Sequence, residues 1–290
     1  LSIARAQAAA PPVSTPAPAL SADLVSSIDR TVEDVLRKTG APSASIAIVQ
    51  DGRIALAKAY GLARLDSALP ASPAMRYSIG SISKQFTATA ILLLAQEGKL
   101  RLDDPVARWF PELTRANDVT LRHLLSMTSG YSDYWPQDYV MPPMLQDVTA
   151  AQIMRDWAQK PLDFAPGSEW QYSNTNYVIA GAIVERAAGQ PLFAFLRDRV
   201  FGPLQMTTVI DTDQAPLGER EPMRYRIFGA APARPAPKEG RGWMYAAGEL
   251  AMTASDLARW DISLMNQSML SPASYTRLET EVLLNNGAPT

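Results

Sequence analysis

The chain opens with two regular patterns of apolar positions. Apolar side chains recur every three or four positions across residues 24–36, which predicts an amphipathic helix. The runs at residues 45–50 and 53–60 are strand-like and are joined by Asp51 and Gly52, a pair that tolerates the positive φ angles of a tight turn. The pattern therefore predicts a helix followed by a β-hairpin.

The later patterns are mostly helical. Residues 81–98 form the strongest helix prediction, with a broad apolar surface and Gly98 at the C-terminal end. Asp104 stands directly before Pro105, an order typical of a helix cap rather than of a catalytic acid paired with Asp103. Strands followed by many helices predict an α/β fold, in which an antiparallel sheet lobe flanked by helices is joined to an all-helical lobe.

This order divides the chain into a leader and one catalytic domain. Residues 1–20 contain the small-x-small sequence Ala6-Gln7-Ala8 before a Pro/Ala-rich stretch, which predicts a signal-peptide remnant and a linker. We therefore expect an exported protein of the bacterial envelope, periplasmic or secreted. No later stretch is long and apolar enough to span a bilayer. The predicted catalytic domain, residues 21–290, has three parts: a sheet lobe (about 21–75), a helical lobe with loops (about 76–245) and a returning helix (246–290).

Composition narrows the chemistry. The formal net charge is −2 and no run of Lys or Arg occurs, so the chain lacks the electrostatic footprint of a nucleic-acid-binding protein. It has no cysteine and a single histidine, His123, which excludes a cysteine nucleophile and a His/Cys zinc site. Apolar neighbours favour a packed helical role for His123 over that of a catalytic base. No cofactor or metal is predicted, and a small molecule or a peptide is the expected partner.

Ser81 and Lys84 form an S-x-x-K element at the start of the predicted helix. A hydroxyl needs a nearby base to act as a nucleophile, and a spacing of three on a helix brings the lysine amine close to the serine oxygen. A cation is unfavourable in the first turn of a helix, and such an unfavourable local choice more often marks function than stability. The alternative is a solvent-facing lysine beside a capping serine.

Tyr172 and Asn174 form a second element, in a turn that precedes another predicted helix. A phenol near an amine can relay protons, and a carboxamide both accepts and donates hydrogen bonds. The same residues are also typical of a polar turn in which Asn174 caps the helix. Together with Ser81 and Lys84 they complete a proton-transfer set without histidine.

These elements resemble the serine β-lactamase-related hydrolases, which include class C β-lactamases, D,D-carboxypeptidases, D-aminopeptidases and family VIII esterases. The resemblance covers about residues 23–283. The segments that carry it occur in the family's order, at residues 77–87, 100–111, 120–130, 166–181 and 247–258.

The resemblance implies a role for each candidate residue. Ser81 would attack a carbonyl carbon, and Lys84 would help to remove its proton. Tyr172 would act as general base in acylation and pass the proton to the leaving group, although the family's division of labour between lysine and tyrosine is disputed. Asn174 would hold Lys84 and bind the substrate's amide, and the backbone N–H of Ser81 would be one oxyanion donor.

The chain departs from the family pattern in its last third. The third motif, a K-T-G or H-x-G tripeptide on a strand beside the site, is not found, and Lys238-Glu239-Gly240 comes too early to be its equivalent. We therefore expect the C-terminal strands of the sheet to be absent, as in an incomplete copy of a longer protein. Met127 and Glu249 are smaller departures, at positions where relatives often have His and Gly.

The expected function is that of a serine hydrolase that forms an acyl-enzyme on Ser81 with β-lactams or D-amino-acid peptides. The alternatives are an esterase of the same fold and a non-catalytic penicillin- or peptidoglycan-binding protein. The missing third motif favours the binding protein, whereas the complete set of four residues opposes it. Trp135, Trp170 and Trp243 are candidates for the walls of the cleft.

Overall fold

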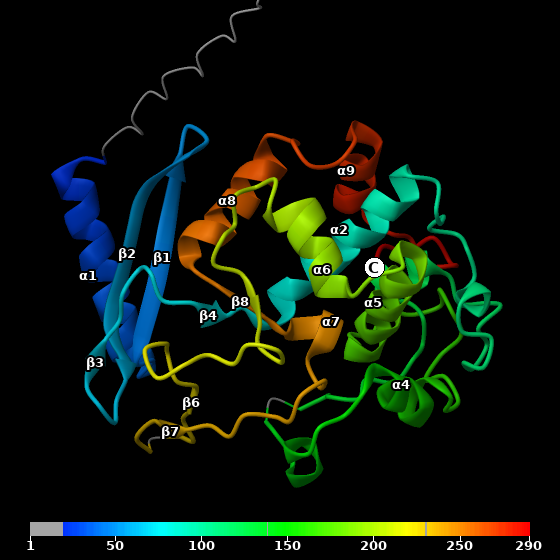
Figure 1. The fold of residues 1–290 in the computed structure, drawn as a ribbon, viewed down its shortest axis with the longest axis horizontal. Helices are drawn as coiled ribbons and strands as arrows, with labels where there is room; N and C mark the ends of the chain where they lie inside the picture. Colours follow the sequence, from blue (N-terminus) through cyan, green and yellow to red (C-terminus); the bar gives the residue numbers. More distant parts are fainter. Residues whose placement is uncertain (1–19, 138, 230) are drawn as a thin grey trace, which may run out of the picture.

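The computed structural model describes residues 20–137, 139–229 and 231–290 (Figure 1). Apart from Leu20, the predicted leader lies outside these residues. A β-hairpin with its flanking helices occupies one side of the molecule, and most of the helices gather on the other (Figure 1). The candidate residues come from the region between the two.

The predicted helix and hairpin are confirmed at the start of the described chain. Helix α1 (Ala22–Thr39) is followed by the antiparallel strands β1 (Ser43–Gln50) and β2 (Arg53–Arg64), and β3 (Leu69–Pro70) pairs with the far end of β2. The turn between β1 and β2 has positive φ angles, 52° at Asp51 and 71° at Gly52. Both residues therefore adopt the positive φ angles that the sequence pattern predicts for a tight turn.

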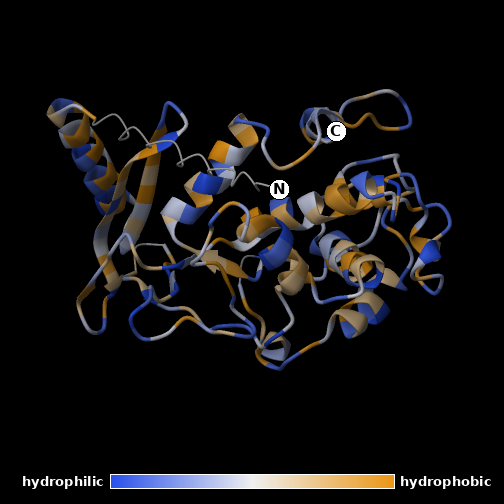
Figure 2. Ribbon diagram, turned by 45° about the horizontal axis from the view of Figure 1, so that its top comes forward, coloured by the Kyte–Doolittle hydropathy of each residue, from blue (hydrophilic) through white to orange (hydrophobic). Residues whose placement is uncertain are grey.

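The hairpin lies between two helices, α1 and α8 (Ala254–Met265) (Figure 1). Hydrophobic and hydrophilic stripes alternate along α1 (Figure 2). Asp29 of α1 accepts hydrogen bonds of 2.7 Å from both Lys58 Nζ and Tyr60 Oη of β2. Among the described residues β1 has no strand partner on its outer edge, and α8 covers one face of the hairpin.

A second, small sheet pairs three strands that are far apart in the sequence. Its strands are β4 (Tyr77–Ser78), β8 (Leu250–Met252) and β5 (Ile210–Asp211), in the order β4-β8-β5 and all antiparallel. Strand β8 thereby brings the segment before α8 next to the start of helix α2 (Ser83–Gln96). A separate two-stranded ribbon is formed by β6 (Tyr225–Arg226) and β7 (Arg234–Pro235).

The core is built around two long helices, α2 (Ser83–Gln96) and α5 (Asn174–Ala188), which pack against each other. Most residues of both helices are buried, because apolar side chains surround each of them rather than forming one stripe. The shorter helices are α3 (Leu121–Leu125), α4 (Ala150–Ile153), α6 (Leu192–Leu196), α7 (Tyr245–Gly248) and α9 (Pro272–Glu279). Single turns are η1 (Gly80–Ile82), η2 (Val106–Arg108), η3 (Pro142–Leu145), η4 (Met154–Ala158) and η5 (Arg197–Phe201).

Two local predictions need correction. The α-helix begins at Ser83 rather than Ser81, because the preceding residues form the 3-10 turn η1. The helix expected after Pro105 is only a single 3-10 turn, preceded by extended backbone at the proline. Asp104 instead accepts a hydrogen bond of 2.8 Å from the backbone N–H of Arg101 and forms an ion pair with Arg108.

No single helix in the described ranges is long and apolar enough to cross a membrane. The bent pair of α5 with the segment Leu192–Phe201 meets the criteria of length and composition only when both parts are joined.

Candidate active site

Ser81 lies at the entrance to α2. Gly80 leaves β4 with a positive φ of 53°, and the 3-10 turn that follows carries Ser81. Ser81 is exposed, whereas Ser83 and Lys84 in the first turn of α2 are buried. The hydroxyl is therefore open to a ligand, while the lysine amine beside it is withdrawn from water.

Three oxygen atoms surround the Lys84 amine. Nζ lies 3.0 Å from Ser81 Oγ, 2.8 Å from Asn174 Oδ1 and 2.8 Å from the carbonyl oxygen of Ala247 in α7. The contact with Ser81 follows from the spacing of three residues along the chain. A neutral amine has two hydrogens and one lone pair, so it can donate to Asn174 and Ala247 while its lone pair faces Ser81.

Tyr172 and Asn174 reach the same place from the turn that begins α5. Tyr172 Oη lies 2.7 Å from Ser81 Oγ and 3.5 Å from Asn174 Oδ1. The backbone N–H of Gln171 donates to the carbonyl of Met127 at 3.0 Å, which fixes this turn to the one before it. The structure thus brings all four predicted side chains together.

Burial sets the acid–base properties of the site. It lowers the pKa of Lys84 from 10.5 to about 7, against the opposing effect of the Asp133 carboxylate. It also raises the pKa of Tyr172, although the hydrogen bond with Ser81 acts in the other direction. At neutral pH about half of the Lys84 amines are neutral, whereas Tyr172 keeps its proton. Burial thus favours the neutral amine of Lys84, a form that can accept a proton, and the protonated phenol of Tyr172.

Asp133 is a site residue that the sequence analysis did not identify. Its Oδ1 accepts hydrogen bonds from the backbone N–H of Asn174 at 2.9 Å, from the Asn174 side-chain amide at 3.2 Å and from the backbone N–H of Trp135 at 3.1 Å. The carboxylate thereby turns the carboxamide so that its oxygen faces Lys84. Only the closeness of Asp133 to the turn at residues 128–130 could have pointed to it.

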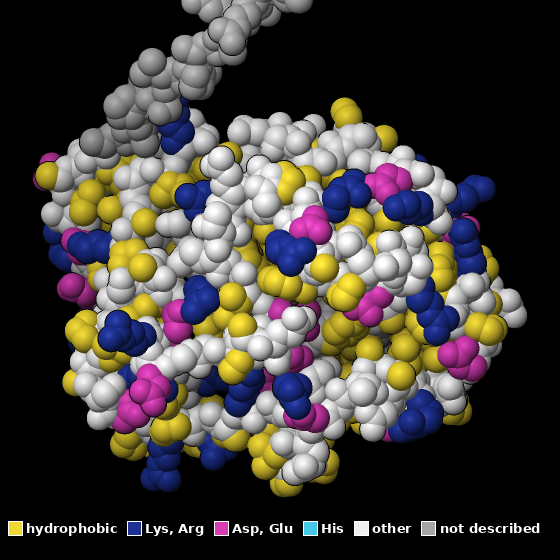
Figure 3. Space-filling model, in the orientation of Figure 1, with side chains coloured by type: hydrophobic (Ala, Val, Ile, Leu, Met, Phe, Trp, Pro, Cys, Tyr) yellow, Lys and Arg dark blue, Asp and Glu magenta, His cyan; other side chains and the backbone are white. Residues whose placement is uncertain are grey.

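A cleft of about 1000 Å³ opens over Ser81. Its lining includes Tyr172, Asp133, strand β6 and residues of the segment that follows β7. Over the face of the molecule drawn in Figure 3, acidic and basic side chains are interspersed and form no patch of a single sign. Other lining residues are Trp135, Tyr139, Arg224, Phe228 and Glu239.

The three tryptophans proposed as cleft walls have different positions. Trp135 lines the cleft. Trp243 is buried, with its ring 6.0 Å from that of Tyr134 and 6.3 Å from that of Trp157. Trp170 is exposed and does not line the cleft over Ser81. Only one of the three therefore faces a ligand bound there.

His123 has a structural position. It lies in α3, where its Nδ1 accepts a hydrogen bond of 3.2 Å from the backbone N–H of Thr120, and the Thr120 hydroxyl accepts one of 3.3 Å from the backbone N–H of His123. These reciprocal bonds form a capping box. The prediction of a packed helical histidine is confirmed.

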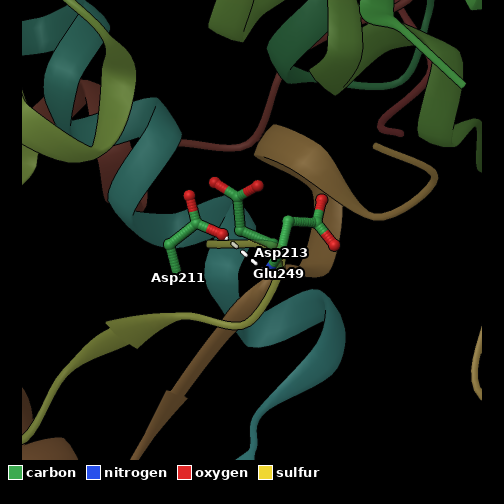
Figure 4. Close-up of side chains that lie close together, drawn as sticks. All are labelled: Asp211, Asp213 and Glu249. Carbon is green, nitrogen blue, oxygen red and sulfur yellow. Dashed lines mark hydrogen bonds between the residues drawn. The ribbon is translucent and has the colours of Figure 1, made fainter. Parts of the chain in front are cut away.

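Three carboxylate groups lie close together at the C-terminal end of α7. The sequence analysis did not predict this group. Asp211, Asp213 and Glu249 have oxygens that all lie within 4.8 Å of one another (Figure 4). Burial, reinforced by the charges of Asp211 and Asp213, holds the pKa of Glu249 well above its usual range. Among the described residues this is the one group of carboxylates close enough together to hold a cation.

The fold and the site together define a class of protein. A serine in the turn before a central helix is followed three residues later by a buried lysine, and a tyrosine and an asparagine come from the turn that begins a second helix. This is the arrangement of the serine β-lactamase and penicillin-binding-protein fold. The predicted α/β fold of this type is confirmed by the solved structures that resemble the chain.

Comparison with known families makes the assignment specific. Residues 28–289 match the Beta-lactamase family, and the chain belongs to it. Protein flp of Staphylococcus aureus (strain MW2) is 35% identical over 251 residues, which are 83% of this chain and 49% of that protein. The chain thus spans about half the length of the curated relatives that it matches.

Solved structures extend the comparison. The D-amino acid amidase from Ochrobactrum anthropi SV3, complexed with L-phenylalanine amide, superimposes with a TM-score of 0.80 at 27% identity, over 88% of this chain and 73% of that one. The octameric penicillin-binding protein homologue from Pyrococcus abyssi superimposes with a TM-score of 0.78 at 26% identity, over 89% and 60% of the two chains. EstCE1, a hydrolase with promiscuous acyltransferase activity, shares the fold with a TM-score of 0.75 at 22% identity, over 87% of this chain and 76% of that one.

Proposed function

We propose that this protein is a serine hydrolase that cleaves small amides or esters through an acyl-enzyme on Ser81. The observation that carries the proposal is the contact of the exposed Ser81 hydroxyl with a buried amine at 3.0 Å and a phenol at 2.7 Å. A hydroxyl held between a base and a proton donor at these distances is the arrangement that nucleophilic catalysis requires.

In the first half-reaction the neutral Lys84 amine takes the proton of Ser81 while the serine oxygen attacks the carbonyl carbon. The negative charge develops on the carbonyl oxygen, while Tyr172 keeps its proton beside the serine oxygen. Collapse of the tetrahedral intermediate breaks the bond to the leaving group, which receives the proton from Lys84 through Tyr172. An acyl-enzyme and the free amine or alcohol result.

In the second half-reaction a water molecule attacks the acyl carbon. The same base takes the proton of the water and returns it to the Ser81 oxygen when the acyl bond breaks. The backbone N–H of Ser81, which the family resemblance implies as one oxyanion donor, would supply part of the stabilisation of the oxyanion.

The substrates proposed are D-amino-acid amides or peptides and β-lactams, with esters as the alternative. All of them react through an acyl-enzyme on a serine. The relatives include a D-amino acid amidase. They also include the putative penicillin-binding protein PbpX of Bacillus subtilis, which is 27% identical over 267 residues, 90% of this chain and 64% of that protein. The cleft of about 1000 Å³ is large enough for a substrate of this size.

Labelling with a fluorescent fluorophosphonate, followed by mass spectrometry of the peptides, tests the proposal. The expected adduct is on Ser81, and Ser81→Ala should abolish it. Ser78→Ala is the matched control, because Ser78 lines the same cleft but, unlike Ser81, forms no hydrogen bond with the Lys84 amine. Absence of labelling in the folded protein, or equal labelling of the Ser81→Ala variant, would rule out the proposed nucleophile.

We also propose that the protein is exported. The proposal is supported by the small-x-small sequence at residues 6–8 and the Pro/Ala-rich stretch after it. N-terminal sequencing of the protein from a fractionated bacterial host should locate a processed chain in the envelope or the medium. An unprocessed chain in the cytoplasm would contradict the proposal.

A further inference from the structure

Asp133 stands in the cleft as a carboxylate without a cationic side chain beside it. It is only partly buried and lines the same cavity as Ser81, Tyr172 and Asn174. In the described part of the chain no Lys or Arg lies within ion-pair distance of it. Half-buried carboxylates usually have a charged partner, because losing water without one is costly.

The other charged groups of the cleft are already engaged. Arg224 and Glu239 form an ion pair with each other, and the Glu239 side chain is 1% exposed. Arg226 lies over the ring of Phe228, 5.3 Å from its centroid, and is exposed to solvent. Of the two carboxylates that line the cleft, Asp133 is therefore the one available to bind a positive charge on the ligand.

The two oxygens of Asp133 differ in their occupation. Oδ1 accepts three hydrogen bonds, two from Asn174 and one from Trp135, and so holds the first turn of α5 in place. Oδ2 accepts only a long bond of 3.3 Å from the Asn174 side-chain amide. With one long hydrogen bond against the three of Oδ1, Oδ2 keeps capacity for a further donor.

We propose that Asp133 binds a protonated amine of the substrate, and that the preferred substrates carry a free ammonium group close to the bond that is cleaved. The inference rests on the proposed function, because it assigns the substrate class of the Ser81 site. Aromatic side chains at Trp135, Tyr139 and Phe228 line the same cleft and provide apolar walls for the rest of the ligand. An amino-acid amide with an apolar side chain combines both features.

The binding of an ammonium group also affects the base. Asp133 acts electrostatically on Lys84 and favours its charged form, while Asn174 connects the two groups through its carboxamide. A cation bound at Asp133 offsets that carboxylate and places a like charge nearby, so the pKa of Lys84 falls further. The phenols of Tyr134 and Tyr172 are the other titratable groups that face Asp133. The substrate would thus help to generate the neutral amine that activates Ser81.

Three matched p-nitroanilides test the inference: D-phenylalanine p-nitroanilide, its N-acetyl derivative and the desamino analogue from 3-phenylpropanoic acid. We expect the wild-type kcat/KM to be about 10- to 100-fold higher with the free amine, as for hydrogen bonds between charged groups. With this substrate alone, kcat/KM should fall above about pH 8, where an α-amino group loses its proton.

Asp133→Asn is the decisive variant, because the amide oxygen can still accept the bonds that hold α5. We expect it to remove the preference for the free amine, so that the ratio of kcat/KM between the free-amine and desamino substrates falls to about one, whatever loss the two substrates share. Asp163→Asn is the matched control, since Asp163 bonds to Ser132 and Gln171 nearby but does not line the cleft. An equal loss of kcat/KM with all three substrates would show that Asp133 only positions Asn174, and would overturn the inference.

The outcomes remain separable from those of the proposed function. If fluorophosphonate labels Ser81 but the wild type shows no preference for the amine, only the inference fails. If Asp133→Asn does not fold, the pH profiles of the wild type with the three substrates decide alone. A profile above pH 8 that is the same with and without the amine would then overturn the inference.

Discussion

Replacing Lys84 by methionine removes the proposed base while keeping a side chain of similar length. Methionine fills the same buried channel but cannot accept a proton. It also leaves the acceptors Asn174 Oδ1 and Ala247 O without the amine, which at present lies 2.8 Å from each. The variant therefore tests whether the amine acts through its lone pair.

The size of the effect follows from the lowered pKa. With a pKa of about 7 instead of 10.5, about half of the amines are neutral at pH 7. An unperturbed lysine would be neutral in only about one molecule in three thousand at that pH. Burial thus increases the amount of the base roughly a thousandfold, equivalent to about 4 kcal/mol.

The assay is the pH dependence of kcat/KM between pH 5 and 9. With the desamino substrate, which has no amine to titrate, we expect a wild-type plateau above pH 7 and a tenfold fall for each pH unit below it, because kcat/KM reports the ionisation of the free enzyme. Lys84→Met should lower the plateau by about 10²- to 10⁴-fold and abolish the acid limb. Lys99→Arg, on the exposed surface beside Glu97, should change neither.

Two results would refute this reasoning. The first is a wild-type profile whose acid limb lies near pH 4, because a carboxylate rather than Lys84 would then be titrating. The second is an unchanged limb in Lys84→Met, provided that circular dichroism shows the variant to be folded. Tyr172 would then be the base, as the family resemblance had implied.

Two further predictions concern the support of the site. Glu249→Gln should become more stable relative to the wild type as the pH rises. In the wild type the folded protein keeps the Glu249 proton, whereas the unfolded chain releases it above about pH 4.3. The free energy of unfolding of the wild type therefore falls by up to about 1.4 kcal/mol per pH unit. Urea unfolding at pH 5 and pH 8 measures this, and a constant difference between the two proteins would contradict it. Gly181→Ala should cost about 1–3 kcal/mol and reduce kcat/KM, because a Cβ there would lie 2.3 Å from Ala246 Cβ and would displace α7 with its Ala247 carbonyl. Gly218→Ala, where a Cβ meets nothing within 4 Å, is the control, and equal behaviour of the two variants would show that the contact of α5 with α7 does not matter.

Much of the fold was predictable because its signals are local. The hairpin turn at Asp51 and Gly52 depends on the conformational freedom of two adjacent residues. The contact of Lys84 with Ser81 depends on a spacing of three residues across the 3-10 turn η1 and the first turn of α2. The errors at Ser81 and Pro105 were equally local, because a 3-10 turn and an α-helical turn satisfy nearly the same sequence pattern.

The resemblance to the family linked Tyr172 and Asn174 with Ser81, although about ninety residues separate them. The sequence by itself thus determined the hairpin, the long helices, the S-x-x-K element and the identity of the four candidate residues.

Tertiary packing alone decided the properties of the site. The amine of Lys84 is buried because α7 lies against the start of α2, and no pattern along the chain expresses that contact. The same holds for the carboxylate of Asp133 at the start of α5, and for the meeting of Asp211 and Asp213 with Glu249. Sequence spacing fixes which groups share one turn of helix, whereas loss of water and the approach of distant charges set their pKa values.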